Sequence, residues 1–417
     1  MTVRRSAAAL TAASAVLWGA VAGAPAAIAA PSPTPEPVIP AGLFGTTDPT
    51  YDGVWRQSLA LSAQDALKEV PSAKAVDWLT GQQCANGGFA SYRADATEPC
   101  DVKTVLDTNA TAAALQALTA LGGHKDEIKK GLAWLKSVQN ADGGWSYNPG
   151  MPSDANSTAI VIGAFAAADA RPATMTSDSG KTPYDALVSF AVPCTDKAAG
   201  GAFAYQPDKA GKLIANGDAT AAAVLGGLGR GMVVKGPKPG GAPKCDTPAK
   251  ATPEQSARNG AAYLAKTLAK TGHLDSPPLP GAADPAPQPD FGNTADAVVA
   301  LSAAGHKDKA AASVAWLEKN SAAWAKQGGP AAYAQLVLAA HAYGADPRNF
   351  GGADLVRQLN ATGPAPESTV APTPPAAAEE AETTGGDSAG IWWIVGAGLA
   401  AGVGVGFLFS GRRKNKK

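Results

Sequence analysis

Four aspartates near the starts of apolar runs could act as a general acid and a general base. Asp107, Asp154, Asp218 and Asp296 occur in the strings DTNATA, DANSTA, NGDATA and GNTADA. Two carboxyl groups that face each other across a site can protonate and deprotonate a substrate, as in glycan hydrolysis. These residues therefore allow a hydrolase or lyase.

The same strings fit a structural role equally directly. Asp or Asn before an apolar helical run accepts hydrogen bonds from the first backbone N–H groups, which stabilises the helix by about 1 kcal/mol. The pattern recurs in every unit of the chain, whereas one catalytic site needs only one pair. Helix capping is therefore the stronger interpretation, and we expect no catalytic residue.

Aromatic side chains stand beside these helix starts and could contact a ligand. The pairs are Phe89 with Tyr92, Trp145 with Tyr147, and Phe203 with Tyr205. Aromatic rings stack on sugars and on other flat molecules, and the amide-rich starts of helices favour anionic or polar groups. We expect these residues to form a ligand site: Tyr92, Arg93, Asp107, Asn109, Tyr147, Asp154, Asn156, Tyr205, Asn216, Asp218, Asn293 and Asp296.

An internal repeat must position these residues. The string AVDWLTGQQCANGGFASY from Ala75 recurs as GLAWLKSVQNADGGWSY from Gly131, and an apolar helical run follows each copy. Each unit is thus a helix, a glycine-rich turn and a second helix, with a period of about fifty to seventy residues that is typical of stacked helical hairpins. Weaker copies follow as far as residue 343.

The repeat predicts an all-α fold of about six hairpins. Runs rich in Ala and Gly, such as Thr108 to Leu121 and Thr220 to Gly229, are small enough to pack as an inner ring, so we expect an α6/α6 toroid. Two segments rich in Pro, 236–253 and 276–289, are expected to be surface loops within it.

The repeat residues resemble a known family. Trp134, Leu135, Gln139, Gly143 and Trp145 fit the QW repeat of squalene cyclases and other class II terpene cyclases, and the earlier copy fits with Phe89 as its last aromatic. Protein prenyltransferase β subunits and the helical domain of cobalamin carriers look similar. The resemblance implies an α/α toroid with a central cavity, in which six residues tie neighbouring hairpins together: Trp78, Gln83, Phe89, Trp134, Gln139 and Trp145.

The catalytic motifs of that family are missing. Class II cyclases protonate an alkene with a DxDD motif, but this chain contains no two adjacent aspartates, and Asn109 and Asn156 stand where the acid would be. Carboxylate clusters for magnesium and the Asp, Cys and His set for zinc are missing too. We therefore expect no metal and no cofactor, and binding of a small, conceivably cobamide-like ligand in place of catalysis. An enzyme acting on envelope lipid or glycan and a structural adhesion scaffold remain as alternatives.

The two ends of the chain indicate export and anchoring. A basic, apolar and small-residue pattern predicts a signal peptide at 1–29, and an uncharged run followed by a basic tail predicts a single-pass membrane helix. The expected segments are 1–29 signal peptide, 30–50 Pro-rich leader, 51–360 toroid, 361–389 linker, 390–411 transmembrane helix and 412–417 cytoplasmic tail. The toroid would then lie outside the cell and could pass its ligand to a membrane transporter; linkage to the cell wall through a sortase signal is the alternative.

The balanced charge argues against nucleic-acid binding, and the cysteines agree with export. Lysine plus arginine and aspartate plus glutamate each number 35, so the chain has no net positive charge to hold nucleic acid. Four cysteines allow three pairings in an oxidising compartment, and we favour Cys84 with Cys100 and Cys194 with Cys245, because each pair brackets an excursion rich in Gly or Pro.

Overall fold

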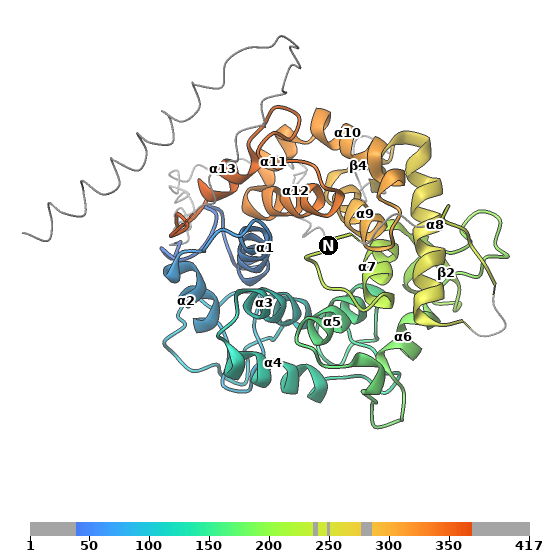
Figure 1. The fold of residues 1–417 in the computed structure, drawn as a ribbon. Coiled ribbons are helices and arrows are strands. Elements are labelled where there is room, and N and C mark those ends of the chain that lie inside the picture. Colours follow the sequence, from blue (N-terminus) through green and yellow to red (C-terminus); the bar gives the residue numbers. More distant parts are fainter. Residues whose placement is uncertain (1–38, 237–240, 248–250, 277–285, 369–417) are drawn as a thin grey trace, which may run out of the picture. The chain divides into compact units, whose positions relative to one another are not determined.

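The fold is a closed ring of helices in two layers. In the computed structural model, residues 39–236, 241–247, 251–276 and 286–368 are described. Six helices form the inner layer (Figure 1), each contacts the next, and the last contacts the first. The inner helices are α1 (Gly53–Ala66), α3 (Thr108–Leu121), α5 (Ala155–Ala167), α7 (Gly217–Gly227), α9 (Phe291–Ala303) and α12 (Pro330–Tyr343).

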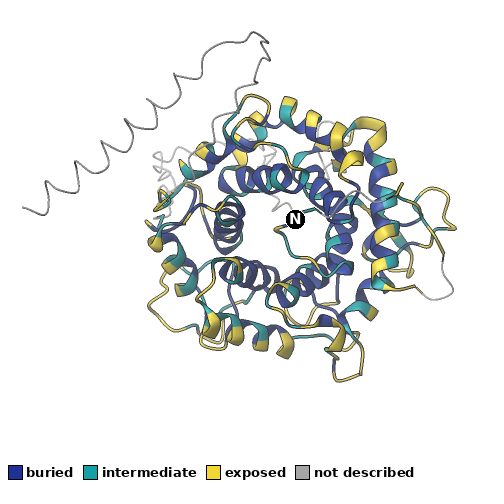
Figure 2. Cartoon of the chain, in the orientation of Figure 1, coloured by how far each residue is buried: buried dark blue, intermediate teal, exposed yellow. Residues whose placement is uncertain are grey.

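The outer layer alternates with the inner one along the chain. Figure 2 shows that the inner helices are mostly buried, whereas the outer helices expose one face to solvent. The predicted α/α toroid is therefore confirmed. The outer helices are α2 (Ala73–Gly81), α4 (Lys125–Ser137), α6 (Pro183–Ser189), α8 (Pro253–Thr271), α10 (Ala311–Asn320), α11 (Ala322–Gly328) and α13 (Leu355–Asn360), with short 3-10 turns at Pro172–Thr174 and Lys307–Ala310.

Two small antiparallel hairpins add to the helices. Strand β1 (Phe203–Pro207) pairs with β2 (Leu213–Asn216), and β3 (Leu274–Ser276) pairs with β4 (Gln288–Asp290). The second strand of each hairpin ends at the N-cap of the next inner helix. The all-α expectation did not include these strands, which arise because the backbone leading into an inner helix pairs with the preceding turn.

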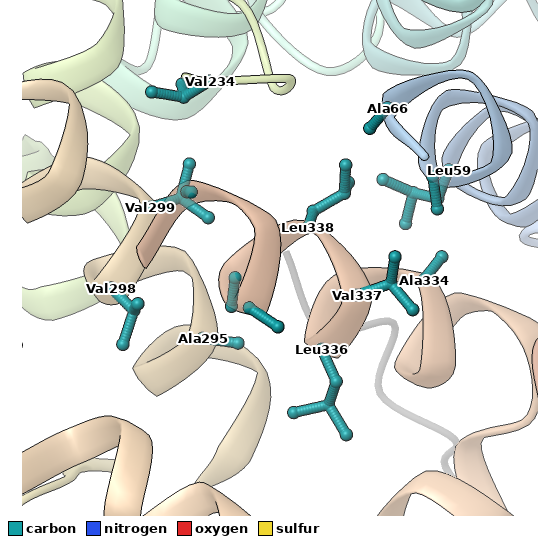
Figure 3. Packing of buried hydrophobic residues seen from close by; sticks show 14 of the residues in the cluster. Leu59, Ala66, Val234, Ala295, Val298, Val299, Ala334, Leu336, Val337 and Leu338 are labelled. Carbon is teal, nitrogen blue, oxygen red and sulfur yellow. The ribbon is translucent and has the colours of Figure 1, made fainter. Parts of the chain in front are cut away.

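Small side chains let the inner helices approach closely. Alanine dominates the buried part of α3 and α7, while larger residues fill the space between the layers. Figure 3 shows Leu336 and Val298 pointing toward the outer helices and Leu338 and Val299 pointing toward the ring interior. The inner helices are apolar on both sides because they face the outer layer and the ring interior at once.

Glycines in the repeat turns contact the next outer helix. Gly87 and Gly143 have φ of +97° and +91°, and a Cβ at either position would lie 2.2 Å from a backbone oxygen, that of Lys130 or Thr182. Only glycine adopts this left-handed backbone readily and also has no Cβ to collide at such a close approach. The Gly-Gly-aromatic pattern is thus a requirement of packing between successive hairpins.

The glutamines and aromatics of the repeat bind the turns to the helices. Gln83 donates hydrogen bonds from Nε2 to the backbone oxygens of Gly87 at 3.0 Å and Glu127 at 2.8 Å, and so links one hairpin to the next. Gln139 makes the first of these bonds, to Gly143, at 2.8 Å. Trp145 is fully buried, and its indole N–H donates to the oxygen of Leu135 at 2.7 Å.

Both favoured cysteine pairings are present. Cys84 is bonded to Cys100 and Cys194 to Cys245, across 16 and 51 positions of sequence respectively. The first disulfide ties the turn after α2 to the loop that leads into α3. The second joins the loop after α6 to the segment before α8, so the first closes an excursion within one hairpin and the second encloses β1, β2 and α7.

Polar contacts between the first and last hairpins close the ring. Glu69, after α1, is 3% exposed and accepts hydrogen bonds from Arg348 at 2.8 Å and from Asn360 at 2.9 Å. Residues outside the range 51–360 also pack here. Phe44 is fully buried in the main core, and Val70 donates its N–H to the oxygen of Ser368.

The predicted signal peptide at 1–29 and transmembrane helix at 390–411 lie outside the described residues. Within the part of the chain that the structure describes, no helix has both the length and the apolar character needed to cross a bilayer.

Candidate functional site

The residues expected to bind a ligand lie at or before the starts of the inner helices, in three settings. Some cap a helix, some line a cavity inside the ring, and some line a wide pocket on the surface. The caps are Asp107, Asp154 and Asn216; the cavity holds Asn156, Asp218 and Asp296; the surface pocket holds Tyr92, Arg93, Asp107 and Tyr147.

The side chains of the capping residues accept hydrogen bonds from backbone N–H groups. Asp107 accepts the N–H groups of Asn109 and Ala110, both at 2.8 Å, and Asp154 accepts that of Ser157 at 2.7 Å. Two of the four candidate acid–base aspartates are thus engaged in helix capping, whereas Asp218 and Asp296 cap no helix.

Tyrosines from the neighbouring unit lie beside the capping aspartates. Burial together with the negative charge of Asp107 raises the pKa of Tyr147 to about 12, and burial together with the charge of Asp154 does the same for Tyr205. Burial also raises the pKa of Asp107 and Asp154, although their hydrogen bonds oppose the shift. The two tyrosine rings remain 42% and 44% exposed at the surface.

A threonine four residues after each cap is a structural element that the sequence interpretation missed. The hydroxyl of Thr111 accepts the N–H of Phe89 at 2.9 Å and donates to the oxygen of Asp107 at 2.7 Å. Thr158, Thr220 and Thr294 accept the corresponding N–H in their own units. The recurring Asp or Asn with Thr four residues later was a signal that could have revealed this link between turn and inner helix.

The central cavity has a volume of about 90 Å³ and lies among the inner helices. Four polar side chains from α5, α7, α9 and α12 line it: Asn156, Asp218, Asp296 and Gln335. Its apolar wall includes Trp55, Leu59, Ile160, Val299 and Leu338. A few polar groups in an apolar concavity are typical of small-molecule sites.

Hydrogen bonds connect the polar residues in pairs. Asn156 donates from Nδ2 to Oδ2 of Asp218 at 2.7 Å, and Gln335 lies with Nε2 at 3.3 and 3.4 Å from the two carboxylate oxygens of Asp296. Asn156 is only 3% exposed, and its Oδ1 has no hydrogen-bond partner among the described residues. The cavity wall therefore presents an acceptor that a ligand could satisfy.

Asp218 influences the titration of Asp296. Burial raises the pKa of Asp296 to about 6, and the negative charge of Asp218 contributes to the increase. Asp296 can consequently gain or lose a proton close to neutral pH, unlike an ordinary exposed aspartate.

A segment after α7, residues 229–236, crosses the ring interior at the C-terminal ends of the inner helices (Figure 1). Gln116 of α3 holds it, because its Oε1 accepts the N–H of Met232 at 2.8 Å while its Nε2 donates to the oxygen of Ile160 at 3.1 Å. Val234 is buried, and Arg230 and Met232 line the cavity. The segment therefore forms part of the cavity wall.

The surface pocket is wider, with a volume of about 710 Å³. Tyr51, Tyr92 and Tyr147 line it, and the ring of Tyr92 stacks on Trp78 with 6.4 Å between centroids. The guanidinium of Arg93 donates hydrogen bonds to the backbone oxygens of Gly81 and Glu98, so it holds the pocket's loop together.

The remaining predicted residues lie nearby. Asn109 is buried in the first turn of α3. Asn293 donates from Nδ2 to Asp290, the cap of α9, at 2.8 Å, and this contact holds its side chain against the helix start.

Comparison with known proteins supports the fold. Residues 47–209 match the family model of the prenyltransferase alpha-alpha toroid domain, which confirms the resemblance seen in the repeat residues. One similar solved structure is the crystal structure of a sugar epimerase from a ruminal bacterium, at 13% identity and a TM-score of 0.39, over 67% of this chain and 80% of that chain. A likeness at this level carries no argument about function. The sequence matches none of the curated proteins with which it was compared.

Proposed function

We propose that this toroid, which resembles the prenyltransferase alpha-alpha toroid family, binds a small polar ligand in its central cavity. One observation carries the proposal: polar side chains from four inner helices meet at a cavity with an apolar wall. Asp218 and Asp296 are not needed as helix caps, since Asn216 and Asp290 cap α7 and α9. Carboxylates in a largely apolar interior cost stability, which favours a role in binding.

The cavity size favours a small ligand or the head group of a larger one. A volume of about 90 Å³ is well below the roughly 300 Å³ or more of pockets for drug-sized molecules. A flat cobamide-like ligand is larger than this cavity, and it would have to bind at the surface pocket beside Tyr92 and Tyr147.

We further propose that the toroid is exported and held at the outer face of the cell membrane. The predicted signal peptide at 1–29, the apolar run at 390–411 and the basic tail after it support this location, as do the two disulfides, which form in oxidising compartments. A toroid tethered in this way could deliver its ligand to a transporter in the same membrane.

Catalysis on an envelope glycan or lipid is the second candidate. The raised pKa of Asp296 beside Asp218 favours it, because one carboxyl with a pKa about one unit below neutral pH and a second carboxyl in the same cavity could serve as acid and base. The family model ends at residue 209, before both of these aspartates, so the family lends this chemistry no support.

Native mass spectrometry of the full chain, recovered from its own host in detergent, tests the binding function. We expect an additional mass that disappears on denaturation and is reduced in the Asp218→Asn variant. Protein without additional mass in both forms, together with no thermal stabilisation by host extract, would contradict the proposal. Release of a chemically altered product during incubation would favour the enzyme.

A further inference from the structure

The polar groups of the central cavity are mainly hydrogen-bond acceptors. Asp218 and Asp296 contribute carboxylates. Nδ2 of Asn156 and Nε2 of Gln335 are already directed at those carboxylates, and Nε2 of Gln116 is directed at the oxygen of Ile160. A ligand that adds further acceptors would meet repulsion, whereas a ligand that adds donors would match these acceptors.

The amide oxygen of Asn156 points to the same conclusion independently. Asn156 is 3% exposed and lines the cavity. Because its Nδ2 donates to Asp218, Oδ1 is the end of the amide that is left without this bond. Oδ1 has no partner among the described residues, and a buried acceptor without a partner costs about 1 to 3 kcal/mol. A donor supplied by the ligand would remove this cost.

The charges around the cavity favour a cation. Asp218 on α7 and Asp296 on α9 lie in its wall, and Asp290 adds a further carboxylate at the start of α9. Arg230 is the cationic side chain of the wall, and it is exposed on segment 229–236, after the end of α7. The part of the cavity near the helix starts is therefore acidic.

The remaining wall favours an organic cation over a metal ion. Trp55, Leu59, Ile160 and Val299 provide an apolar surface that suits a hydrocarbon stem. No group of three His, Cys, Asp or Glu side chains that could hold a metal occurs among the described residues.

We infer that the central cavity recognises an organic ammonium group on a short apolar stem, through the carboxylates of Asp218 and Asp296 and the amide oxygen of Asn156. This inference rests on the proposed binding function and names its ligand class. The ammonium could belong to a free amine or to a lysine-like group on a larger molecule.

Ligand-observed NMR on the full chain in detergent tests the inference with n-pentylamine and its neutral counterpart 1-pentanol. We expect the amine to bind roughly tenfold or more tightly than the alcohol, and the preference to disappear in Asp218→Asn and Asp296→Asn. Asp77→Asn, an exposed aspartate on the outer helix α2, is the matched control and should keep the preference. Nα-acetyl-lysine methylamide represents a lysine-like ammonium group on a larger molecule. Binding of this probe alone identifies such a group as the ligand, and binding of n-pentylamine alone identifies a free amine.

Two outcomes would overturn the inference. One is equal binding of amine and alcohol, which would indicate that the cavity accepts a neutral ligand and would leave the proposed binding function intact. The other is no binding of either ammonium probe at millimolar concentration by the folded parent chain. The binding function itself stands or fails separately, on the native mass spectra.

Discussion

Asn156 of α5 donates a hydrogen bond to Asp218 of α7 over 2.7 Å, although 62 positions of sequence separate them. Both residues lie two positions after the N-cap of their own helix, Asp154 or Asn216. The bond joins equivalent points of neighbouring inner helices at the wall of the central cavity. Residues that look alike in sequence thus divide into capping groups and cavity groups.

Replacing Asp296 by asparagine should stabilise the fold at neutral pH. Its pKa is about 6 in the folded chain against 3.8 for the free side chain, so its contribution to stability is complete below about pH 4 and is lost as pH rises through about 6. We expect Asp296→Asn to raise the free energy of unfolding by on the order of 1 kcal/mol at about pH 8. Chemical denaturation at about pH 4 and about pH 8 measures this difference. An equal gain in the free energy of unfolding at both values would contradict the assignment.

The Thr111 hydroxyl should contribute measurably to stability, because it joins the repeat turn to α3. Thr111→Val leaves the N–H of Phe89 without its acceptor, and we expect a loss of about 1 to 3 kcal/mol. Thr119→Val on the same helix is the matched control, since the Thr119 hydroxyl has no hydrogen-bond partner among the described residues. Similar effects of both substitutions in urea unfolding would show that the hydroxyl bond is unimportant.

Gly143 should tolerate no side chain. Its left-handed φ alone costs about 1 to 2 kcal/mol for alanine, and a Cβ there also lies 2.2 Å from the oxygen of Thr182. Gly150 has φ of +85° and nothing within 4 Å of its Cβ, so Gly150→Ala measures the backbone strain alone. We expect Gly143→Ala to lower the melting temperature clearly more than Gly150→Ala.

The two disulfides should differ in their effect on stability. Loop closure predicts losses of about 3 and about 4 kcal/mol for bridges that span 16 and 51 positions. The double variants Cys84→Ala/Cys100→Ala and Cys194→Ala/Cys245→Ala, compared by guanidinium unfolding, check the order. A larger loss from the shorter bridge would mean that local packing around Cys84, which is buried, outweighs chain entropy.

Gln116 should control access to segment 229–236. Gln116→Leu removes the bonds to Met232 and Ile160, so trypsin should cleave after Arg230 and Lys235 faster than in the parent chain. Gln139→Leu, which removes a bond to Gly143 in the outer layer, is the control. Peptide mass mapping of timed digests gives the rates, and unchanged cleavage after Gln116→Leu would show that other contacts hold the segment.

Much of the architecture could be predicted from the sequence, because its determinants are local and repeated. The Gly-Gly-aromatic turns are needed wherever a hairpin contacts the next helix, as Gly87 and Gly143 show, and Ala-rich runs suit only a crowded inner layer. The β hairpins before α7 and α9 were not anticipated, since their pairing depends on how the turns meet the helix starts.

The candidate site could be predicted only in part. The sequence by itself determined the set of polar residues at the helix starts, the missing DxDD motif and the residues that form the toroid. It could not separate Asp107 and Asp154 from Asp218 and Asp296, since all four stand in similar strings. Only the tertiary structure decided that the first pair cap helices and the second pair line the cavity. Asp218 and Asp296 lie two and six positions after the N-caps Asn216 and Asp290, where a side chain turns from the helix end to the ring interior.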